Sequence, residues 1–194
     1  MGISLLAVAA FALASSGPVQ DQPRPDPFTL LFASTCMTYF YAPEKLRAEM
    51  ATRGAGVLQG ESARFFLGGK PGTAWSVQGA EGRFVVSWRD DHVCAVFAQR
   101  APVADVHANF ASLLAEAPDP LIASPREEAG PEAGMVRTVS IAWGRPDDKT
   151  ELLFTLTTSG AATSTVQAMA SMARVDAPAN TVKVTPDGAP RRTR

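Results

Sequence analysis

The spacing of hydrophobic residues along this chain of 194 residues alternates between a helical period and a strand-like one. Within residues 27–40, Phe28, Phe32, Cys36 and Tyr39 follow the i, i+4, i+8, i+11 spacing of one helix face. This stripe predicts a helix over residues 27–40 whose apolar face, including Cys36, is buried.

Two shorter helices are expected next. Pro43, a favoured first helical residue, opens a segment that ends at Gly54. A second segment, Glu61 to Leu67, is followed by Gly68, which is typical of a helix C-terminus.

The period then changes to two, which indicates strands. Three short stretches alternate in this way and are separated by tight turns: residues 73–78, 83–88 and 93–98. Short strands joined by tight turns predict an antiparallel meander. In its middle strand Phe84, Val86 and Trp88 fall on one face.

Residues 102–117 return to the helical period. Val106, Phe110 and Leu114 lie on one stripe and Asn109 lies away from it, so one face of this long amphipathic helix is expected to be buried. Residues 118–134 hold four prolines, two glycines and four acidic residues, and we predict that they form a surface loop.

The last part of the chain is again strand-like. Residues 135–143 and 151–159 flank a turn sequence, and residues 165–175 fit either a strand or a helix. We predict a strand there, because Thr165-Val166 and Arg174-Val175 favour one. The fold class is therefore α+β: N-terminal helices, an antiparallel meander, a long helix, and a second meander or hairpin, with the helices packed on an antiparallel sheet.

A short internal similarity accompanies these strands. Residues 87–91 (SWRDD) resemble residues 142–148 (AWGRPDD), each at the end of a strand that enters a turn. Duplication and convergent turn chemistry both explain it, because Asp favours turns in any hairpin.

The N-terminus has the pattern of an export signal. Leu5 to Ala14 is an unbroken apolar run, and Ala12-Leu13-Ala14 has the small-x-small form of a cleavage site. The run is shorter than the about 20 residues that span a bilayer. Because no Lys or Arg precedes Leu5, a buried N-terminal helix remains the alternative.

These patterns divide the chain into four parts. We expect a signal peptide over residues 1–16, a proline-rich tether over 17–27, a single α+β domain over 28–177, and a disordered basic tail over 178–194. No second apolar run is long enough to span a membrane, so no transmembrane segment is expected in the mature chain.

The two cysteines, Cys36 and Cys94, are 58 positions apart. An even number of cysteines in an exported protein predicts a disulfide, and only one pairing exists. Closing a loop of this size removes about 4 kcal/mol of unfolded-chain entropy in the chain-entropy model.

A catalytic alternative is a thiol-dependent hydrolase. Cys36 on an early helix, His92 on a later strand and a downstream acid such as Asp147 follow the chain order of papain-like amidases. An apolar helix stripe stabilises a thiolate poorly, however, and Cys94 offers Cys36 a partner. We therefore favour a non-catalytic role and expect no catalytic residue.

A metal site is a weaker possibility. Asp90, Asp91 and His92 are neighbours at a turn, but the chain contains only two histidines, His92 and His107. This ligand set is too small for a histidine-rich or cysteine-rich zinc site, so we expect no metal and no cofactor.

Three tryptophans, Trp75, Trp88 and Trp143, fall on predicted strands and are candidate ligand-facing aromatics. The alternative is that they fill the core. The formal net charge of −1 argues against a nucleic-acid partner, which leaves an unknown envelope protein or a small apolar or peptide ligand.

Several short pieces within residues 28–100 resemble a family of small exported bacterial proteins with no assigned activity. The pieces are Thr35-Cys36-Met37, Phe66-Leu67 followed by Gly72, Trp75-Ser76-Val77, and Asp91 followed by Cys94-Ala95-Val96-Phe97-Ala98. The resemblance implies a periplasmic or secreted location in a bacterium and supports the cysteine pairing. It carries over no catalytic residue.

The export prediction is tested by intact mass and a thiol count on protein purified from a bacterial periplasm. We expect loss of about 14 to 16 residues, as signal peptidase would leave it, and no free thiol without reductant. An uncleaved chain with two reactive thiols would contradict this prediction and would make Cys36 a candidate nucleophile.

Overall fold

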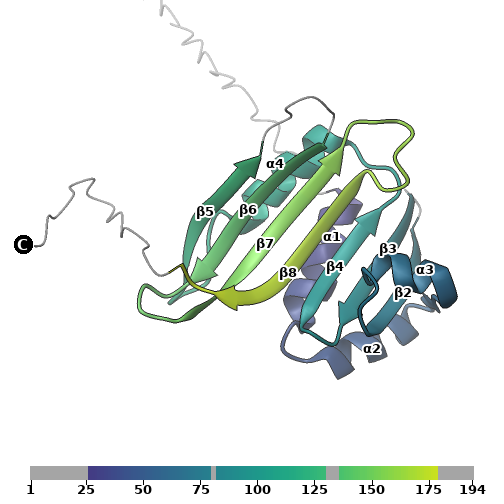
Figure 1. Cartoon of the computed structure of the whole chain (residues 1–194), viewed down its shortest axis with the longest axis horizontal. Helices are drawn as coiled ribbons and strands as arrows, with labels where there is room; N and C mark the ends of the chain where they lie inside the picture. Colours follow the sequence, from purple (N-terminus) through teal and green to yellow (C-terminus); the bar gives the residue numbers. More distant parts are fainter. Residues whose placement is uncertain (1–25, 80–81, 130–135, 179–194) are drawn as a thin grey trace, which may run out of the picture.

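One open antiparallel sheet of eight strands forms the centre of the molecule (Figure 1). The computed structural model describes residues 26–79, 82–129 and 136–178. The strands are β1 (Gly56–Val57), β2 (Gly72–Gly79), β3 (Gly82–Arg89), β4 (Val93–Ala98), β5 (Ile122–Ala129), β6 (Val136–Gly144), β7 (Thr150–Ser159) and β8 (Ala168–Asp176). Their order across the sheet is β1-β2-β3-β4-β8-β7-β6-β5, and every neighbouring pair is antiparallel.

The helices follow the predicted segments. They are α1 (Pro27–Phe32), which continues as the π-helical turn η1 (Ala33–Met37), then α2 (Pro43–Thr52), α3 (Gly60–Phe66) and α4 (Val103–Leu114). The α+β class with helices packed on an antiparallel sheet is confirmed. The predictions for residues 1–25 and 179–194, which cover the signal peptide, most of the tether and most of the tail, lie outside the described residues.

The core lies between one face of the sheet and the layer formed by α1, α2 and α4 (Figure 1). Phe32 of α1 and Phe110 of α4 are fully buried, and their ring centroids are 6.0 Å apart. The indole N–H of Trp143 in β6 donates a hydrogen bond to the carbonyl oxygen of Leu114 at 3.0 Å. This hydrogen bond joins the last turn of α4 to strand β6 of the sheet.

The predicted stripe of the first helix is confirmed, with a π turn inside it. The backbone N–H of Thr38 donates to the carbonyl oxygen of Ala33, five residues earlier, and the Thr38 hydroxyl donates to the same oxygen at 2.9 Å. π turns widen a helix locally. Thr35 and Cys36 within this turn are fully buried, as the apolar stripe requires.

A buried polar contact joins the start of α1 to α4. Asp26 caps α1 by accepting the backbone N–H of Thr29 at 2.9 Å, and its second oxygen accepts the Asn109 amide at 3.0 Å. The prediction that Asn109 lies away from the buried face is therefore wrong, because its polar group has a buried partner. Asp26 and Pro27, the last residues of the predicted tether, form the start of this helix.

Helix α3 lies on the opposite face of the sheet from the other helices (Figure 1). Its Phe66 ring contacts the Phe97 ring of β4 at a centroid distance of 5.1 Å. Phe97 neighbours the fully buried Val96 in the strand, and successive strand residues face opposite sides. A small second layer therefore covers only this part of the sheet.

The predicted surface loop over residues 118–134 contains an edge strand, β5, so this prediction is wrong. An edge strand tolerates proline, because the missing N–H of Pro125 is not needed on the outer side. The register with β6 shifts between Pro125 and Glu128, which is a second feature typical of edge strands. The proline and charge content of residues 118–134 indicated a loop, but prolines and charged side chains are also common in edge strands.

The prediction of a strand within residues 165–175 is confirmed, since β8 lies at the centre of the sheet between β4 and β7. Ala168, Ala170 and Met172 face the core at every second position. The helical spacing of Met169 and Met172 is coincidental.

Cys36 of η1 and Cys94 of β4 form a disulfide, and both side chains are fully buried. The bond joins the first helix to a central strand of the sheet. A disulfide is typical of an oxidising, extracytoplasmic compartment.

Reduction of this disulfide should lower the free energy of unfolding by about 4 kcal/mol, the value for a loop of this length in the chain-entropy model. Urea denaturation of the oxidised and the reduced wild-type protein measures the difference without any change of side-chain volume. The Cys36→Ala, Cys94→Ala variant should be at least as destabilised as the reduced protein. Equal midpoints for oxidised and reduced protein would contradict the prediction.

Candidate functional site

The candidate site is a cleft of about 630 Å³ at one end of the sheet. Three parts of the fold meet there: the α1–α2 corner, the β3–β4 hairpin, and the ends of β7 and β8. The lining residues are Phe40, Tyr41, Pro43, Asp91, His92, Thr150, Arg174, Val175 and Asp176.

The cleft exists because the helical layer changes direction at this point. The chain turns after Tyr39, with the backbone N–H of Ala42 donating to the Tyr39 carbonyl oxygen at 2.9 Å, and α2 then begins at Pro43. Tyr41 at this corner is 74% exposed, a high value for an aromatic side chain. An exposed ring beside a cleft is available to a ligand.

His92, in the β3–β4 hairpin part of the cleft lining, has a left-handed backbone conformation. Its φ angle of 60° lies in the left-handed region, where Asn, Asp and Gly are the more common residues. The conformation is held by the His92 N–H, which donates to the Arg89 carbonyl oxygen at 3.0 Å. His92 closes the loop between the paired residues Arg89 and Val93, and a left-handed residue is the usual way to close such a three-residue hairpin loop.

Four rings connect the two sides of the cleft. Tyr41 contacts Phe40 at a centroid distance of 5.2 Å, Phe40 contacts Trp88 at 5.7 Å, and Trp88 contacts His92 at 6.2 Å. All three contacts are edge-on, the arrangement that the ring quadrupoles favour. Phe40 and Trp88 are buried, so they fix the positions of the two exposed end members, Tyr41 and His92.

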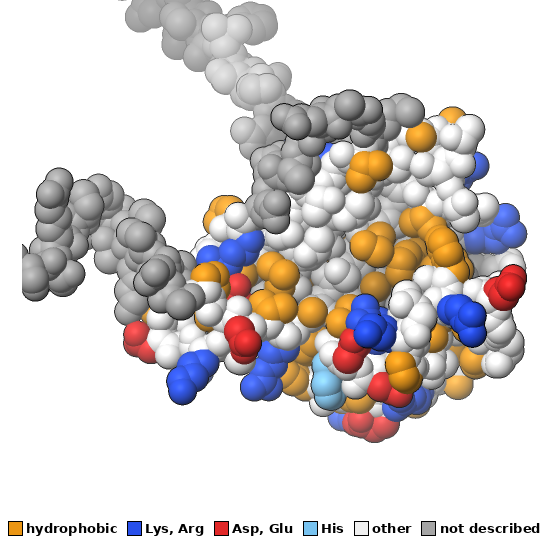
Figure 2. Space-filling model, in the orientation of Figure 1, with side chains coloured by type: hydrophobic (Ala, Val, Ile, Leu, Met, Phe, Trp, Pro, Cys, Tyr) orange, Lys and Arg blue, Asp and Glu red, His pale blue; other side chains and the backbone are white. Residues whose placement is uncertain are grey.

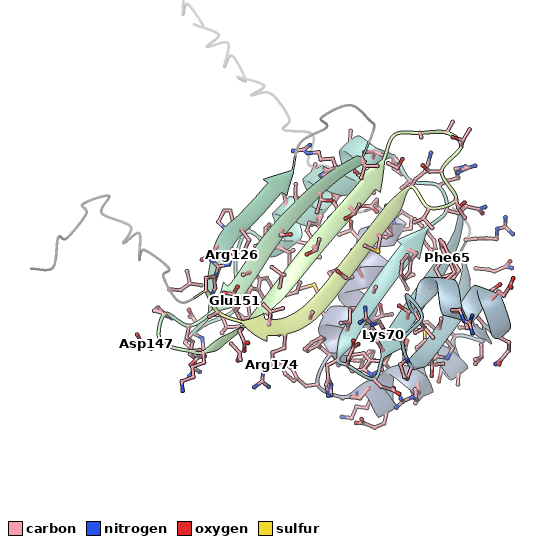
Figure 3. The ribbon with its side chains drawn as sticks, viewed as in Figure 1. Phe65, Lys70, Arg126, Asp147, Glu151 and Arg174 are labelled. Atoms are coloured by element: carbon pink, nitrogen blue, oxygen red, sulfur yellow. A yellow bond between two sulfur atoms is a disulfide. The ribbon has the colours of Figure 1, made fainter. Side chains whose placement is uncertain are left out.

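The third side of the cleft carries both signs of charge. Arg174 and Asp176 occupy alternate positions of β8, so both side chains point to the same face of the strand, and both residues are exposed. Arg174, labelled in Figure 3, donates from Nε to the Thr150 hydroxyl at 3.3 Å. A guanidinium and a carboxylate therefore lie together in the lining of the cleft.

Asp91 adds a second carboxylate, which is held by an arginine. Its Oδ1 accepts a hydrogen bond from Arg89 Nε at 2.9 Å, and Arg89 also donates to Oδ2. The hydrogen bonds from Arg89 lower the pKa of Asp91 below its ordinary value. This carboxylate therefore stays ionised in mildly acidic solution.

This arrangement suits binding better than metal chemistry. Exposed Tyr41, the imidazole of His92 and the two charges on β8 offer stacking, hydrogen bonds and ion pairs within one cleft. No group of three His, Cys, Asp or Glu side chains that would hold a metal ion occurs among residues 26–79, 82–129 and 136–178. A short peptide carries the matching groups: apolar side chains and charges of both signs.

The three tryptophans do not form an exposed aromatic patch. Trp75, Trp88 and Trp143 are 4%, 3% and 8% exposed and belong to the core. The argument for binding that such a patch would have supplied is therefore removed. Trp88 nevertheless contributes indirectly, because its ring supports His92 and Phe40 at the cleft.

The thiol-hydrolase alternative requires a free thiol, and neither cysteine of the chain is free. Both cysteines of the chain are in the disulfide, and Cys36 is fully buried. His92 lies in the cleft, whereas the proposed acid, Asp147, is exposed in the β6–β7 turn (Figure 3).

The sequence patterns did not predict most of the residues that line the cleft. As candidate site residues, the sequence singled out only Asp91 and His92 of this lining, in a possible metal site at a turn, and His92 also in the thiol-hydrolase alternative. Tyr41 next to the helix-opening Pro43, and Arg174 alternating with Asp176 at a strand end, are visible in the sequence but have no characteristic spacing between them. Folding brings these pairs together from positions more than a hundred residues apart.

Comparison with known proteins gives no relative: no family model, no curated protein and no solved structure matches this chain. Within the described residues, no helix is long and apolar enough to cross a membrane.

The hydrogen bonds of Asp91 predict a pH effect with a definite sign. A lowered pKa in the folded state adds stability that is present above the unfolded pKa of about 3.9 and is lost as the pH falls through the folded value. Arg89→Gln should raise the pKa of Asp91 in an NMR titration of its carboxyl carbon.

Arg83→Gln is the matched control, because Arg83 lies on the same strand and donates to Gln99 at 2.9 Å. It should leave the Asp91 titration unchanged. An unchanged titration in Arg89→Gln would show that Arg89 does not hold this carboxylate in solution.

Proposed function

We propose that this chain is an exported bacterial envelope protein, periplasmic or secreted, and that it acts as a non-catalytic binding or accessory module. The N-terminal apolar run with its small-x-small site, residues 5–14, supports export. The buried disulfide adds support, because such bonds form in oxidising compartments. The resemblance to small exported bacterial proteins points the same way.

The ligand site in this proposal is the cleft, and its ligand is a short peptide segment of an envelope protein. The observation that carries the proposal is an open volume of about 630 Å³ whose lining includes the exposed Tyr41 together with Arg174 and Asp176. The volume lies within the usual range for ligand pockets, about 300 to 1,000 Å³. A peptide has a π-stacking or apolar side chain for Tyr41 and charges for Arg174 and Asp176.

A binding screen tests this proposal. Random twelve-residue peptides displayed on phage are selected on the oxidised protein, and the enriched peptides are synthesised and titrated by fluorescence anisotropy. We expect Tyr41→Ala to weaken their binding at least tenfold, because truncation of an aromatic hot-spot residue costs about 2 kcal/mol or more. Arg174→Gln should weaken the binding of acidic peptides in particular.

Leu30→Ala is the matched control. Leu30 is also exposed, at 52%, and lies on α1 outside the cleft lining. It should leave the affinity unchanged. Selection of no peptide, or equal losses in Tyr41→Ala and Leu30→Ala, would overturn the cleft as the binding site.

A further inference from the structure

A second surface of the molecule, the outer sheet face, consists of the residues of β4 to β8 that point away from α1, α2 and α4. Cys94, Met172, Phe154 and Ile141 lie opposite one another in register, and Cys94 is bonded to the helix layer. Residues directly opposite in adjacent strands share a face, so the alternate positions form the outer sheet face. Those positions are Val93, Ala95 and Phe97 in β4, Met169, Ser171, Ala173 and Val175 in β8, Glu151, Leu153, Thr155, Thr157 and Ser159 in β7, Val136, Thr138, Ser140, Ala142 and Gly144 in β6, and Ile122 and Ser124 in β5.

Helices leave most of this face open. Of the helices that the structure describes, only α3 lies on this side, where Phe66 covers Phe97 (Figure 1). Figure 2 shows the described part of the face as a broad area of uncoloured and hydrophobic atoms between charged clusters. Thr155, Thr157, Ser171 and most of their neighbours are partly exposed.

The outer sheet face is almost without charge. Glu151 is the one ionisable side chain among the positions named above, and it is only 6% exposed. It accepts a hydrogen bond from Arg126 Nε of β5 at 3.0 Å, and Arg126 also donates to its second oxygen. The carboxylate is thus neutralised within the same subunit (Figure 3).

The polar groups of the face bond to one another. The hydroxyls of Thr138 and Thr157 are 3.1 Å apart, and those of Ser140 and Thr155 are also 3.1 Å apart. A hydroxyl that already hydrogen-bonds to a neighbouring side chain of the sheet loses less free energy when another protein displaces the water above it. Depletion of charge over a broad exposed area is typical of the centre of a protein interface.

We propose that the outer sheet face binds the same face of a second copy of this chain, forming a two-fold symmetric dimer. Near a two-fold axis each residue lies close to its own counterpart, so any net charge there would repel its copy. Among the described positions named above, the one carboxylate, that of Glu151, is already paired with Arg126, so it adds no such repulsion. This inference is independent of the proposed role of the cleft, which lies at the end of the sheet.

The size of the face fits a dimer. Strands lie about 4.8 Å apart and advance about 3.4 Å per residue, so five strands of about eight residues cover about 650 Å². Stable interfaces bury about 600 to 1,000 Å² per partner. Ile122 at 53% and Val136 at 54% exposure supply exposed apolar surface within this area, and Phe65 of α3, at 59% exposure, adds more beside it.

The test is the mass of the full mature protein by sedimentation equilibrium from 1 to 500 µM, together with one charge variant. We expect the wild type to have twice the chain mass at the higher concentrations. Thr155→Lys places a cation near the centre of the face in each copy, and we expect it to weaken dimerisation at least tenfold. Because Thr155 points outward and is partly exposed, its circular dichroism and melting temperature should stay close to the wild type.

Two further proteins complete the experiment. Thr52→Lys adds the same charge on exposed α2, on the other side of the sheet, and should still dimerise. A mixture of Thr155→Lys and Thr155→Glu should recover the dimer mass, because opposite charges then meet at the axis. A wild type that is monomeric throughout, including one that uses this face for a lipid vesicle or another protein, would overturn the proposal, as would a Thr155→Lys dimer of wild-type affinity.

Discussion

The structure depends on strand β4 and on what is attached to it. β4 pairs with β3 on one side and with β8 on the other, and through Cys94 it is covalently bound to the first helix. The N-terminal meander β2-β3-β4 and the C-terminal meander β6-β7-β8 meet only at the β4–β8 pair. Because that pair is long-range in sequence, its formation carries a large entropy cost. The disulfide holds β4, one strand of this pair, against the helix layer.

This arrangement determines which surfaces remain available for function. The helices cover one face of the sheet except at the end where the chain turns into α2, and the cleft lies there. On the other face, the one described helix is the short α3, which leaves open the outward-facing positions of β6 to β8, where Glu151 is the one ionisable side chain (Figure 1). Each surface has a different chemistry: exposed aromatic and charged groups in the cleft, and small uncharged side chains on the outer sheet face. Among the residues named for the two surfaces, only Val175 of β8 belongs to both, so a ligand site and a self-association surface can coexist.

Periodicity predicted much of the fold, because amphipathic helices and half-buried strands have apolar patterns set by their geometry. Periodicity gave wrong predictions where a tertiary contact outweighed the local sequence pattern. Asn109 is buried since Asp26 accepts its amide, and β5 forms despite Pro125 because an edge strand needs few of its N–H groups. The similarity between residues 87–91 and 142–148 falls at the ends of β3 and β6. These strands do not occupy equivalent places in the two meanders, so turn chemistry explains it better than duplication.

The candidate site was less accessible to sequence reasoning than the fold. A cleft is formed by residues whose proximity is decided by the sheet order, and β8 lies beside β4 only because the chain crosses back to the centre. His92 was visible as a turn residue, but its left-handed backbone and its contact with Trp88 require coordinates. The tryptophans show a different limit of sequence reasoning. Aromatic residues on strands fit a core and a binding face equally well, so the choice between the two requires their burial in the structure.

Native-state hydrogen exchange tests most directly whether the β4–β8 pair unites the two meanders. If it does, the amides of β4 and β8 in the oxidised protein should exchange only through global unfolding, with protection equal to the free energy from urea denaturation. The amides of β3 and β7, on the two sides of the pair, should then share this limit. Separate limits for β2–β4 and β6–β8, with β8 opening while β4 stays protected, would show two independent units and would contradict the account.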